Sequence, residues 1–363
     1  MIDDEEIPHT GLTPEEEKRS EEEVEKKKLK TPKQFSWKSL YEAELSPIEY
    51  YIDHLLINRG TTFFGGPSGS FKTNFLLYMV GKAVLGEDVL KFKTNKPMKV
   101  LWIDEENGAR VMQKKVRQIC DSNGIDPKKV NGKVIFRCMT GLKINESGIR
   151  ELERHINAYS VNIIVIDNIV RCLDGDENDA KEVRKLENLL KRLKEERGIS
   201  FIIIHHLRKP PKEGQDIGLH ELRGSGDFAA QCDNIFIVAH DKYNTTETQK
   251  SFTITQVKCR DQLEMPEQFF VVRDGLKIIN LGEKKEILKA KMGNCAMEIL
   301  DLFTKDEYMK TREIVKEMIK KKYSDKFVRM TLKNMCKAGQ VSDDKYGYYR
   351  PVSPAKTKKS ETS

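Results

Sequence analysis

The chain has 363 residues, of which 38% are hydrophobic and 33% are charged, with a formal net charge of +7. This length predicts about two domains, because single hydrophobic cores stop growing at about 250–300 residues. The seven cysteines show no C-x-x-C or paired spacing, which excludes a zinc-finger or disulfide framework and favours a reducing compartment. The start lacks signal-peptide features and no apolar run could cross a bilayer, so we expect a cytoplasmic protein with no membrane partner.

Residues 1–33 are highly charged with few large apolar side chains, which predicts a disordered tail. A domain over 34–282 follows, in which β-rich runs alternate with amphipathic helical stretches. The first five expected strands are TTFFGG (61–66), KVLWID (99–104), VIFRCM (134–139), NIIVID (162–167) and SFIIIHH (200–206). Later strands within 233–275 are expected to extend the sheet in a partly antiparallel way. The alternation predicts an α/β fold with a mainly parallel sheet covered on both faces.

The stretch GGPSGSFKTN (65–74) joins the first strand to a helix and resembles the phosphate loop G-x-x-x-x-G-K-[ST], with Phe71 replacing the second glycine. In such a loop, backbone N–H groups surround a phosphate, the lysine reaches the β- and γ-oxygens, and the hydroxyl holds Mg²⁺. The residue just before the lysine begins the helix and need not have a positive φ, so Phe71 is tolerated there if its ring points away from ATP. The candidate ATP-binding residues are Gly66, Gly69, Ser70, Phe71, Lys72, Thr73 and Asn74.

A second acidic position is needed to complete the Mg²⁺ shell. Asp167 ends a buried strand and is predicted to hold Mg²⁺ together with Thr73. Its neighbour is Asn168 rather than a glutamate, so the carboxylate that positions water must come from elsewhere. The strand that ends in Asp-Glu-Glu (104–106) supplies candidates, and strand alternation sends its two glutamates to opposite sides.

This combination resembles the RecA-like hexameric helicase superfamily, and within it the RepA-type plasmid and phage replication ATPases. The resemblance covers residues 45–275 and implies a RecA-like P-loop NTPase domain. It implies that Glu106 is the catalytic glutamate, with Glu105 as the second choice. It also implies that His206, rather than His205, senses the γ-phosphate. Two histidines that merely cap a strand by hydrogen bonds are the alternative.

Two further stretches carry the resemblance. ELRGSGDFAAQCD is similar to the loop that touches single-stranded DNA in the central channel of such rings, which places Arg223, Gly224 and Gly226 near phosphates. VKCRDQ is similar to the K-x-R element that reaches the neighbouring subunit's nucleotide, which implies that Lys258 and Arg260 act in trans. A solvated basic pair on an edge strand is the alternative for the second stretch.

Residues 283–352 predict a smaller domain of three helices and a hairpin, and 353–363 a flexible tail. The first of these helices is expected over 294–307. The third, capped by Ser324, places basic side chains on one face and apolar side chains on the other. The basic side chains proposed to contact nucleic acid are Lys326, Arg329 and Lys333. The arrangement resembles a winged helix-turn-helix, which implies contact with duplex DNA, and a packing module is the alternative.

These features imply an Mg²⁺- and ATP-dependent DNA helicase or translocase, a homo-oligomer of six subunits that acts on single-stranded DNA during replication. A RadA-like recombination or repair ATPase that forms filaments is a first alternative. A DNA-binding replication initiator or regulator that uses nucleotide only as a switch is a second.

Overall fold

The computed structural model describes residues 35–175, 180–206, 231–241, 249–303, 308–338, 340–343 and 347–351. The tails predicted at 1–33 and 353–363 therefore lie outside the described residues. Within these ranges, every helix is too short or too polar to span a bilayer.

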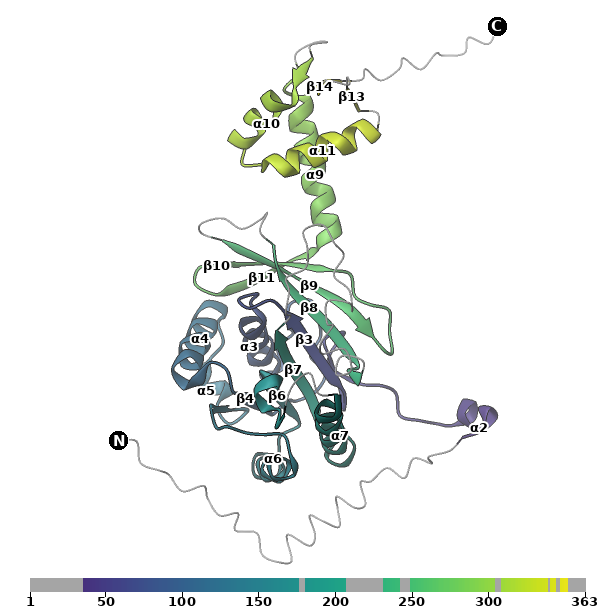
Figure 1. Cartoon of the computed structure of the whole chain (residues 1–363), viewed down its shortest axis with the longest axis vertical. Coiled ribbons are helices and arrows are strands. Elements are labelled where there is room, and N and C mark those ends of the chain that lie inside the picture. Colours follow the sequence, from purple (N-terminus) through teal and green to yellow (C-terminus); the bar gives the residue numbers. More distant parts are fainter. Residues whose placement is uncertain are drawn as a thin grey trace, which may run out of the picture.

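A nine-stranded sheet forms the centre of the larger part of the molecule (Figure 1). Its strands, in spatial order, are β11 (Lys277–Glu283), β10 (Gln268–Arg273), β9 (Lys250–Cys259), β8 (Asn234–His240), β3 (Thr61–Gly66), β7 (Ser200–His206), β6 (Ile163–Asp167), β4 (Val100–Asp104) and β5 (Val134–Cys138). The six strands from β8 to β5 pair in parallel, whereas β9, β10 and β11 extend the β8 edge in an antiparallel way. The expected α/β fold with a mainly parallel sheet is confirmed.

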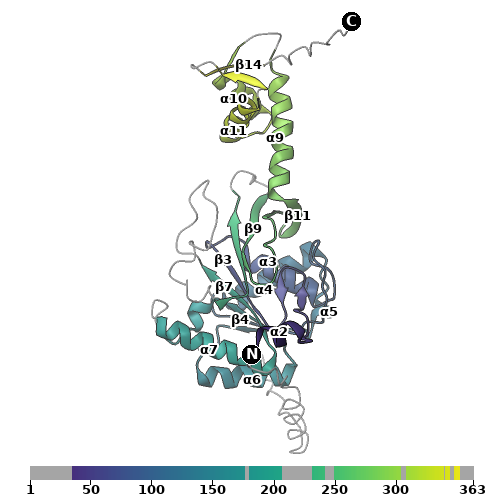
Figure 2. The same ribbon diagram turned by 90° about the vertical axis from the view of Figure 1, so that its right-hand side faces the viewer.

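Each strand sends alternate side chains to opposite faces of the sheet. Both faces are covered, so both sets of side chains are buried. In β6, Ile163 and Val165 belong to one hydrophobic core, and Ile164 and Ile166 belong to the other. Helices cover both faces, as Figures 1 and 2 show from two directions. They are α3 (Lys72–Ala83) and α4 (Gly108–Asn123) over the first core, and α6 (Glu146–Tyr159) and α7 (Ala180–Arg197) over the second.

Short elements complete this part. The hairpin of β1 (Tyr50–Ile52) and β2 (Leu56–Ile57) leads into β3, and the short helix α2 (Trp37–Glu42) precedes it. The remaining two are α5 (Pro127–Val130) after α4 and the 3₁₀ turn η1 (Ile169–Cys172) after β6.

Two elements differ from the expectation. Strand β11 was not expected, although Asp274 and Gly275, both with positive φ, form a tight turn after β10 of the kind that Asp-Gly pairs favour in hairpins. The helix expected over 294–307 is α9 (Lys284–Leu300), which starts ten residues earlier. Gly293 lies inside this helix, where a glycine costs about 1 kcal/mol, an amount that tertiary packing overrides.

The smaller part has its own core, drawn entirely from residues 288–349. Its elements are α9, β12 (Met309–Lys310), α10 (Thr311–Lys320), α11 (Asp325–Lys337), β13 (Val341–Asp343) and β14 (Tyr348–Pro351). The three strands pair in the order β12-β14-β13. The domain boundary between 282 and 283 stays a prediction. Strand β11 ends at Glu283, and α9, which begins at Lys284, leads away from the large sheet (Figure 2).

Helix α11 has the two faces expected from its sequence. The Ser324 hydroxyl accepts a hydrogen bond from the Phe327 amide, as an N-cap does. Val328 and Leu332 are fully buried in the small core. The basic residues proposed for nucleic-acid contact, Lys326, Arg329 and Lys333, are exposed. Their contact with nucleic acid, and the assignment of a winged helix, stay predictions.

We predict that Leu332→Ala lowers the free energy of unfolding by about 2–5 kcal/mol, because it opens a cavity in the small core. Its neighbour Lys333 is exposed on the opposite face, so Lys333→Ala should change that energy by less than about 0.5 kcal/mol. Urea unfolding followed by circular dichroism measures both. Equal effects of the two substitutions would contradict the assignment of this core.

Candidate functional site

The loop between β3 and α3 is shaped by its glycines. A Cβ atom added to Gly66 would lie 2.2 Å from the carbonyl oxygen of Val238, so only glycine fits there. Gly69 has a φ of 75°, in the left-handed region that glycine adopts without strain. The loop therefore brings its backbone close to β8 and then turns sharply into the first turn of α3.

The backbone of Phe71 has a positive φ, which was not expected, whereas its ring points into the core, as expected. Its φ is 70°, so the residue before the lysine does adopt the left-handed conformation, as the N-cap of α3. The ring packs against Phe252 at 5.6 Å and against His240 at 5.2 Å between centroids, on the edge of the large core. We infer that this packing offsets the backbone strain of a non-glycine residue, which is of order 1–2 kcal/mol.

Lys72 is buried and its ammonium lies inside the loop. Nζ donates to the carbonyl oxygens of Gly66 and Pro67, each at 2.8 Å, and lies 3.3 Å from Nδ1 of His206. Burial lowers the pKa of Lys72 to about 8, against the opposing influence of the Asp167 and Glu106 carboxylates. The amine is still mainly protonated at pH 7, so it presents a desolvated positive charge at the position where a phosphate loop holds phosphate oxygens.

Thr73 and Asp167 meet at the same edge of the sheet. The Thr73 hydroxyl donates to Oδ2 of Asp167 at 2.9 Å. The other oxygen of Asp167, Oδ1, is buried and accepts no hydrogen bond from any described residue, and the same holds for Oδ2 of the neighbouring Asp104. Burial raises the pKa of Asp167 to about 6. A divalent cation would neutralise this desolvated charge, so the donor set fits Mg²⁺.

Asp167 and Thr73 could supply one carboxylate and one hydroxyl oxygen as direct protein ligands. Among the described residues, no cluster of three or more His, Cys, Asp or Glu side chains could hold a metal by itself. This agrees with the usual behaviour of Mg²⁺, which keeps several waters and binds through one or two carboxylates and the phosphates of a substrate.

His206 links the lysine to a carboxylate. Its Nε2 lies 2.9 Å from both oxygens of Glu106, while Nδ1 faces Lys72. The tautomer with its proton on Nε2 satisfies both contacts, because it donates to Glu106 and accepts from Lys72. The hydrogen bond with His206 lowers the pKa of Glu106, and the charges of Lys72 and Lys115 add to this effect against the opposing effect of burial. Glu106 is thus ionised at neutral pH.

Glu105 points the other way and performs a different task. Its buried carboxylate accepts hydrogen bonds from the backbone amides of Thr140, Gly141 and Leu142 and from the Thr140 hydroxyl. These contacts hold the segment that follows β5. Of the two adjacent glutamates, Glu106 faces His206 and Lys72. Glu105, the second choice, instead binds the backbone of the segment after β5.

Lys115 is a charged residue near the site that sequence reasoning missed. It comes from the second turn of α4, and its Nζ donates to the Asn107 side-chain oxygen at 2.9 Å. The Asn107 amide groups in turn bind Oδ1 of Asp104. The charge of Lys115 is close enough to act on the pKa values of Glu106, Lys72 and Asp167. In the sequence, Lys115 lies nine residues after Glu106, on the helix that follows the strand. This spacing is the only sequence signal from which its approach to the site could have been predicted.

Lys258 and Arg260 lie at the opposite edge of the sheet from the phosphate loop. Cys259 pairs with Asn234, and Asn234 pairs with Thr62, near the start of β3. The loop begins four residues farther along β3, about 13 Å away at 3.3 Å per residue. Arg260 also faces away, since its Nη1 lies 3.4 Å from Oδ1 of Asp233. Neither side chain can reach the phosphate loop of its own chain.

Several candidates lie elsewhere. Arg223, Gly224 and Gly226 fall outside the described residues. The Asn74 side-chain oxygen is buried and accepts no hydrogen bond within the described ranges.

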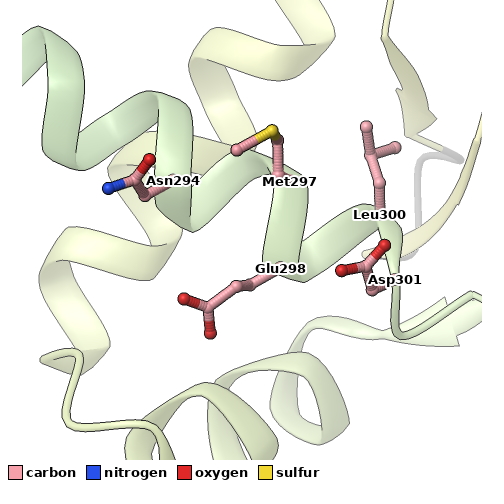
Figure 3. Close-up of a pocket in the computed structure, with 5 residues that line it drawn as sticks. All are labelled: Asn294, Met297, Glu298, Leu300 and Asp301. Carbon is pink, nitrogen blue, oxygen red and sulfur yellow. The ribbon is translucent and has the colours of Figure 1, made fainter.

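A hollow of about 480 Å³ occurs on the last two turns of α9 (Figure 3). Two of its five lining residues, Glu298 and Asp301, are acidic and none is basic, so it does not suit a phosphate.

Residues 25–212, more than half of the chain, match the model of the family described as AAA domain. Among solved structures, a KaiC-like protein from the archaeon Pyrococcus horikoshii shares 16% identity, with a TM-score of 0.45 over 64% of this chain and 99% of the other. A RadB recombinase shares 16% identity, with a TM-score of 0.43 over 61% and 90%. Comparison with curated proteins gave no match.

The raised pKa of Asp167 makes a prediction about stability. The folded chain keeps this proton up to about pH 6, whereas the unfolded chain loses it near 3.8, so stability falls as the pH rises between these values. The difference between these two pKa values lowers the free energy of unfolding by about 3 kcal/mol above pH 6, relative to its value at acid pH. Asp167→Asn should therefore stabilise the nucleotide-free protein by about 3 kcal/mol at about pH 7.5, and by about half as much at about pH 5.

Urea unfolding without Mg²⁺ or nucleotide measures this effect. Asp121→Asn, at an exposed position on α4, serves as the control and should change stability by less than about 0.5 kcal/mol. A destabilised Asp167→Asn protein at neutral pH would show that the carboxylate is already compensated in the folded chain.

Proposed function

The chain belongs to the AAA domain family, and on that premise we propose that it is an Mg²⁺-dependent ATPase that assembles from identical subunits and moves along single-stranded DNA. The observation that carries the catalytic part is the continuous contact from Lys72 through His206 to Glu106, beside the Thr73–Asp167 pair. All five side chains come from one edge of the sheet, where a parallel sheet places its ligands.

Each side chain has a definite task in this proposal. Lys72 binds the β- and γ-phosphate oxygens, and Thr73 and Asp167 hold Mg²⁺, which when bound offsets charge on those oxygens. Glu106 orients the attacking water through its ionised carboxylate. His206 touches both the lysine and the glutamate, so loss of the γ-phosphate changes its hydrogen bonds and is passed on to the chain after β7.

The position of Lys258 and Arg260 supports assembly. Because they lie at the edge opposite the phosphate loop, they can meet a γ-phosphate only in a neighbouring copy. Such a contact joins one edge of a subunit to the other edge of the next, which is a heterologous interface. A heterologous interface closes into a ring or continues as a helical filament, depending on its rotation.

We propose the closed form, a ring of six subunits that acts as a helicase of RepA type in DNA replication. Arg223, Gly224 and Gly226 would contact the strand inside the ring, and the basic face of α11 would contact duplex DNA. A RadA-like filament in recombination or repair follows from the same interface with a different rotation. Electron microscopy of the ATP-bound protein on single-stranded DNA distinguishes the two, because rings and helices have different outlines.

We predict that Glu106→Gln reduces ATP turnover by a factor of about 100 to 10,000 and leaves nucleotide affinity unchanged, because it removes the water-orienting carboxylate but no phosphate contact. Turnover is measured by phosphate release, and affinity with a fluorescent ATP analogue. Glu105→Gln is the matched control. It should lower stability by about 1–3 kcal/mol, because its amide faces the donors at 140–142, and it should retain turnover where folded. Full activity of Glu106→Gln would refute the assignment.

A second prediction concerns sharing of the site between subunits. Arg260→Ala and Lys72→Ala should each abolish turnover in a pure preparation. In an equal mixture, about a quarter of the interfaces pair an intact phosphate loop with an intact Arg260 of the next subunit. The mixture should recover activity roughly in that proportion. No recovery, despite subunit exchange shown by fluorescence energy transfer, would rule out action of Arg260 in trans.

A further inference from the structure

The three-stranded sheet of the small part has one face against its core and one face that is free of that core. Met309 and Tyr349 pack on the core, and they are paired across β12 and β14. Because side chains alternate along a strand, the residues on either side of this pair belong to the outer face. The outer face is made of Tyr308, Lys310, Ser342, Tyr348 and Arg350.

Aromatic and basic side chains alternate on this outer face. Lys310 is paired with Tyr348 across the two strands, and its Nζ lies 5.2 Å from the centre of that ring. In the next pair the order is reversed, and the Arg350 guanidinium carbon lies 5.2 Å from the centre of the Tyr308 ring. None of the five outer residues is acidic. The Tyr308 ring is 47% exposed.

The sheet that carries these side chains is firmly held. Arg350 Nε donates to the Ser342 hydroxyl of β13 at 3.1 Å, which fixes the guanidinium on the outer face. The hydroxyl and amide of Thr311, at the start of α10, both donate to the Gly347 carbonyl oxygen, at 2.8 and 3.0 Å. These contacts tie β14 to β13 and the residue before β14 to the start of α10, which limits the conformational freedom that the surface loses when a ligand binds.

We propose that the outer face of the three-stranded sheet binds single-stranded nucleic acid, with bases stacked on Tyr308 and Tyr348 and phosphates beside Lys310 and Arg350. Unpaired bases expose their faces, whereas a duplex hides them, so flat rings flanked by cations suit the single-stranded form. A base that stacks on either ring releases the cation to a flanking phosphate. Stacking on tyrosine is stronger than an exposed cation–π contact, so this exchange is favourable.

This site differs from the one expected on α11. The basic face of that helix carries cations without aromatic side chains, as a surface for duplex phosphates does, whereas the sheet face offers both. The proposal also needs neither ATP nor assembly, so it holds or fails independently of the ATPase proposal.

Photochemical crosslinking of the full chain tests the site directly. A short oligonucleotide that contains 5-iodouracil is irradiated with the protein in the absence of nucleotide, and the attached peptides are identified by mass spectrometry. Crosslinks at Tyr308 and Tyr348 are expected. Crosslinks found only at other residues, including those in 207–230 or on α11, would overturn the proposal.

Fluorescence anisotropy with a short oligothymidylate supplies the energetic test. The pair Tyr308→Ala and Tyr348→Ala, made together in an Arg223→Ala background, should weaken binding about 25-fold or more, at about fivefold or more per lost ring. The matched pair Tyr308→Phe and Tyr348→Phe keeps the rings and should bind within about twofold of the unchanged rings. Tyr159→Ala, at a partly exposed tyrosine on α6, should have no effect.

Two outcomes overturn the proposal: the alanine pair binds like its parent, or the phenylalanine pair loses as much affinity as the alanine pair. If the alanine pair fails to fold by circular dichroism, Lys310→Gln with Arg350→Gln replaces it. That pair should lower the slope of log affinity against log salt by about 1.4, from two lost phosphate contacts. An unchanged slope also overturns it.

Discussion

The parallel pairing of β3, β7, β6 and β4 is the constraint on which the candidate site depends. Parallel strands end at the same edge of a sheet, so residues that are far apart in the chain become neighbours there. Gly66 is in register with His206, and Asp104 is in register with Asp167. A shift of one residue in any of these registers would turn the functional side chain toward the opposite hydrophobic core.

Burial of charge is the second feature of this edge. Lys72 and Asp167 are both almost completely buried, and burial disfavours the charged form of each. Hydrogen bonds to carbonyl oxygens and to the Thr73 hydroxyl compensate only in part, since one oxygen of Asp167 has no partner among the described residues. A site that keeps uncompensated charge in the empty chain gains more when a phosphate and a cation of opposite charge arrive.

The two edges of the sheet are organised separately. At the amino edge, Asp233 accepts from the Thr61 amide at 2.8 Å and lies within 3.4 Å of both Lys194 and Arg260. One carboxylate thus ties the start of β3 to α7 and to the chain after β9. This arrangement gives Arg260 a fixed position while leaving its side chain about half exposed. This edge is separated from the phosphate loop by the length of β3.

The features of the site that depend on residues close together in the chain could be predicted from the sequence. The β3 and β7 strands were predicted to the residue, because continuous Phe and Ile runs between turns identify buried strands, and the glycine-rich loop with Lys72 and Thr73 marks a phosphate site. Strand alternation also indicated that Glu105 and Glu106 point apart. The α/β fold class and the assignment as a P-loop ATPase follow from signals of this kind.

Other properties depend on contacts between distant segments, and no local pattern contains them. The left-handed φ of Phe71 is tolerated because Phe252, from an antiparallel strand far along the chain, packs on its ring. Which glutamate faces His206, the approach of Lys115 and the outward position of Tyr308 were decided in the same way, by strand order and packing. The sequence alone determined which chemical groups are present and which strands and helices carry them. The tertiary structure decided which of them meet, because only the pairing of strands sets distances between residues remote in the chain.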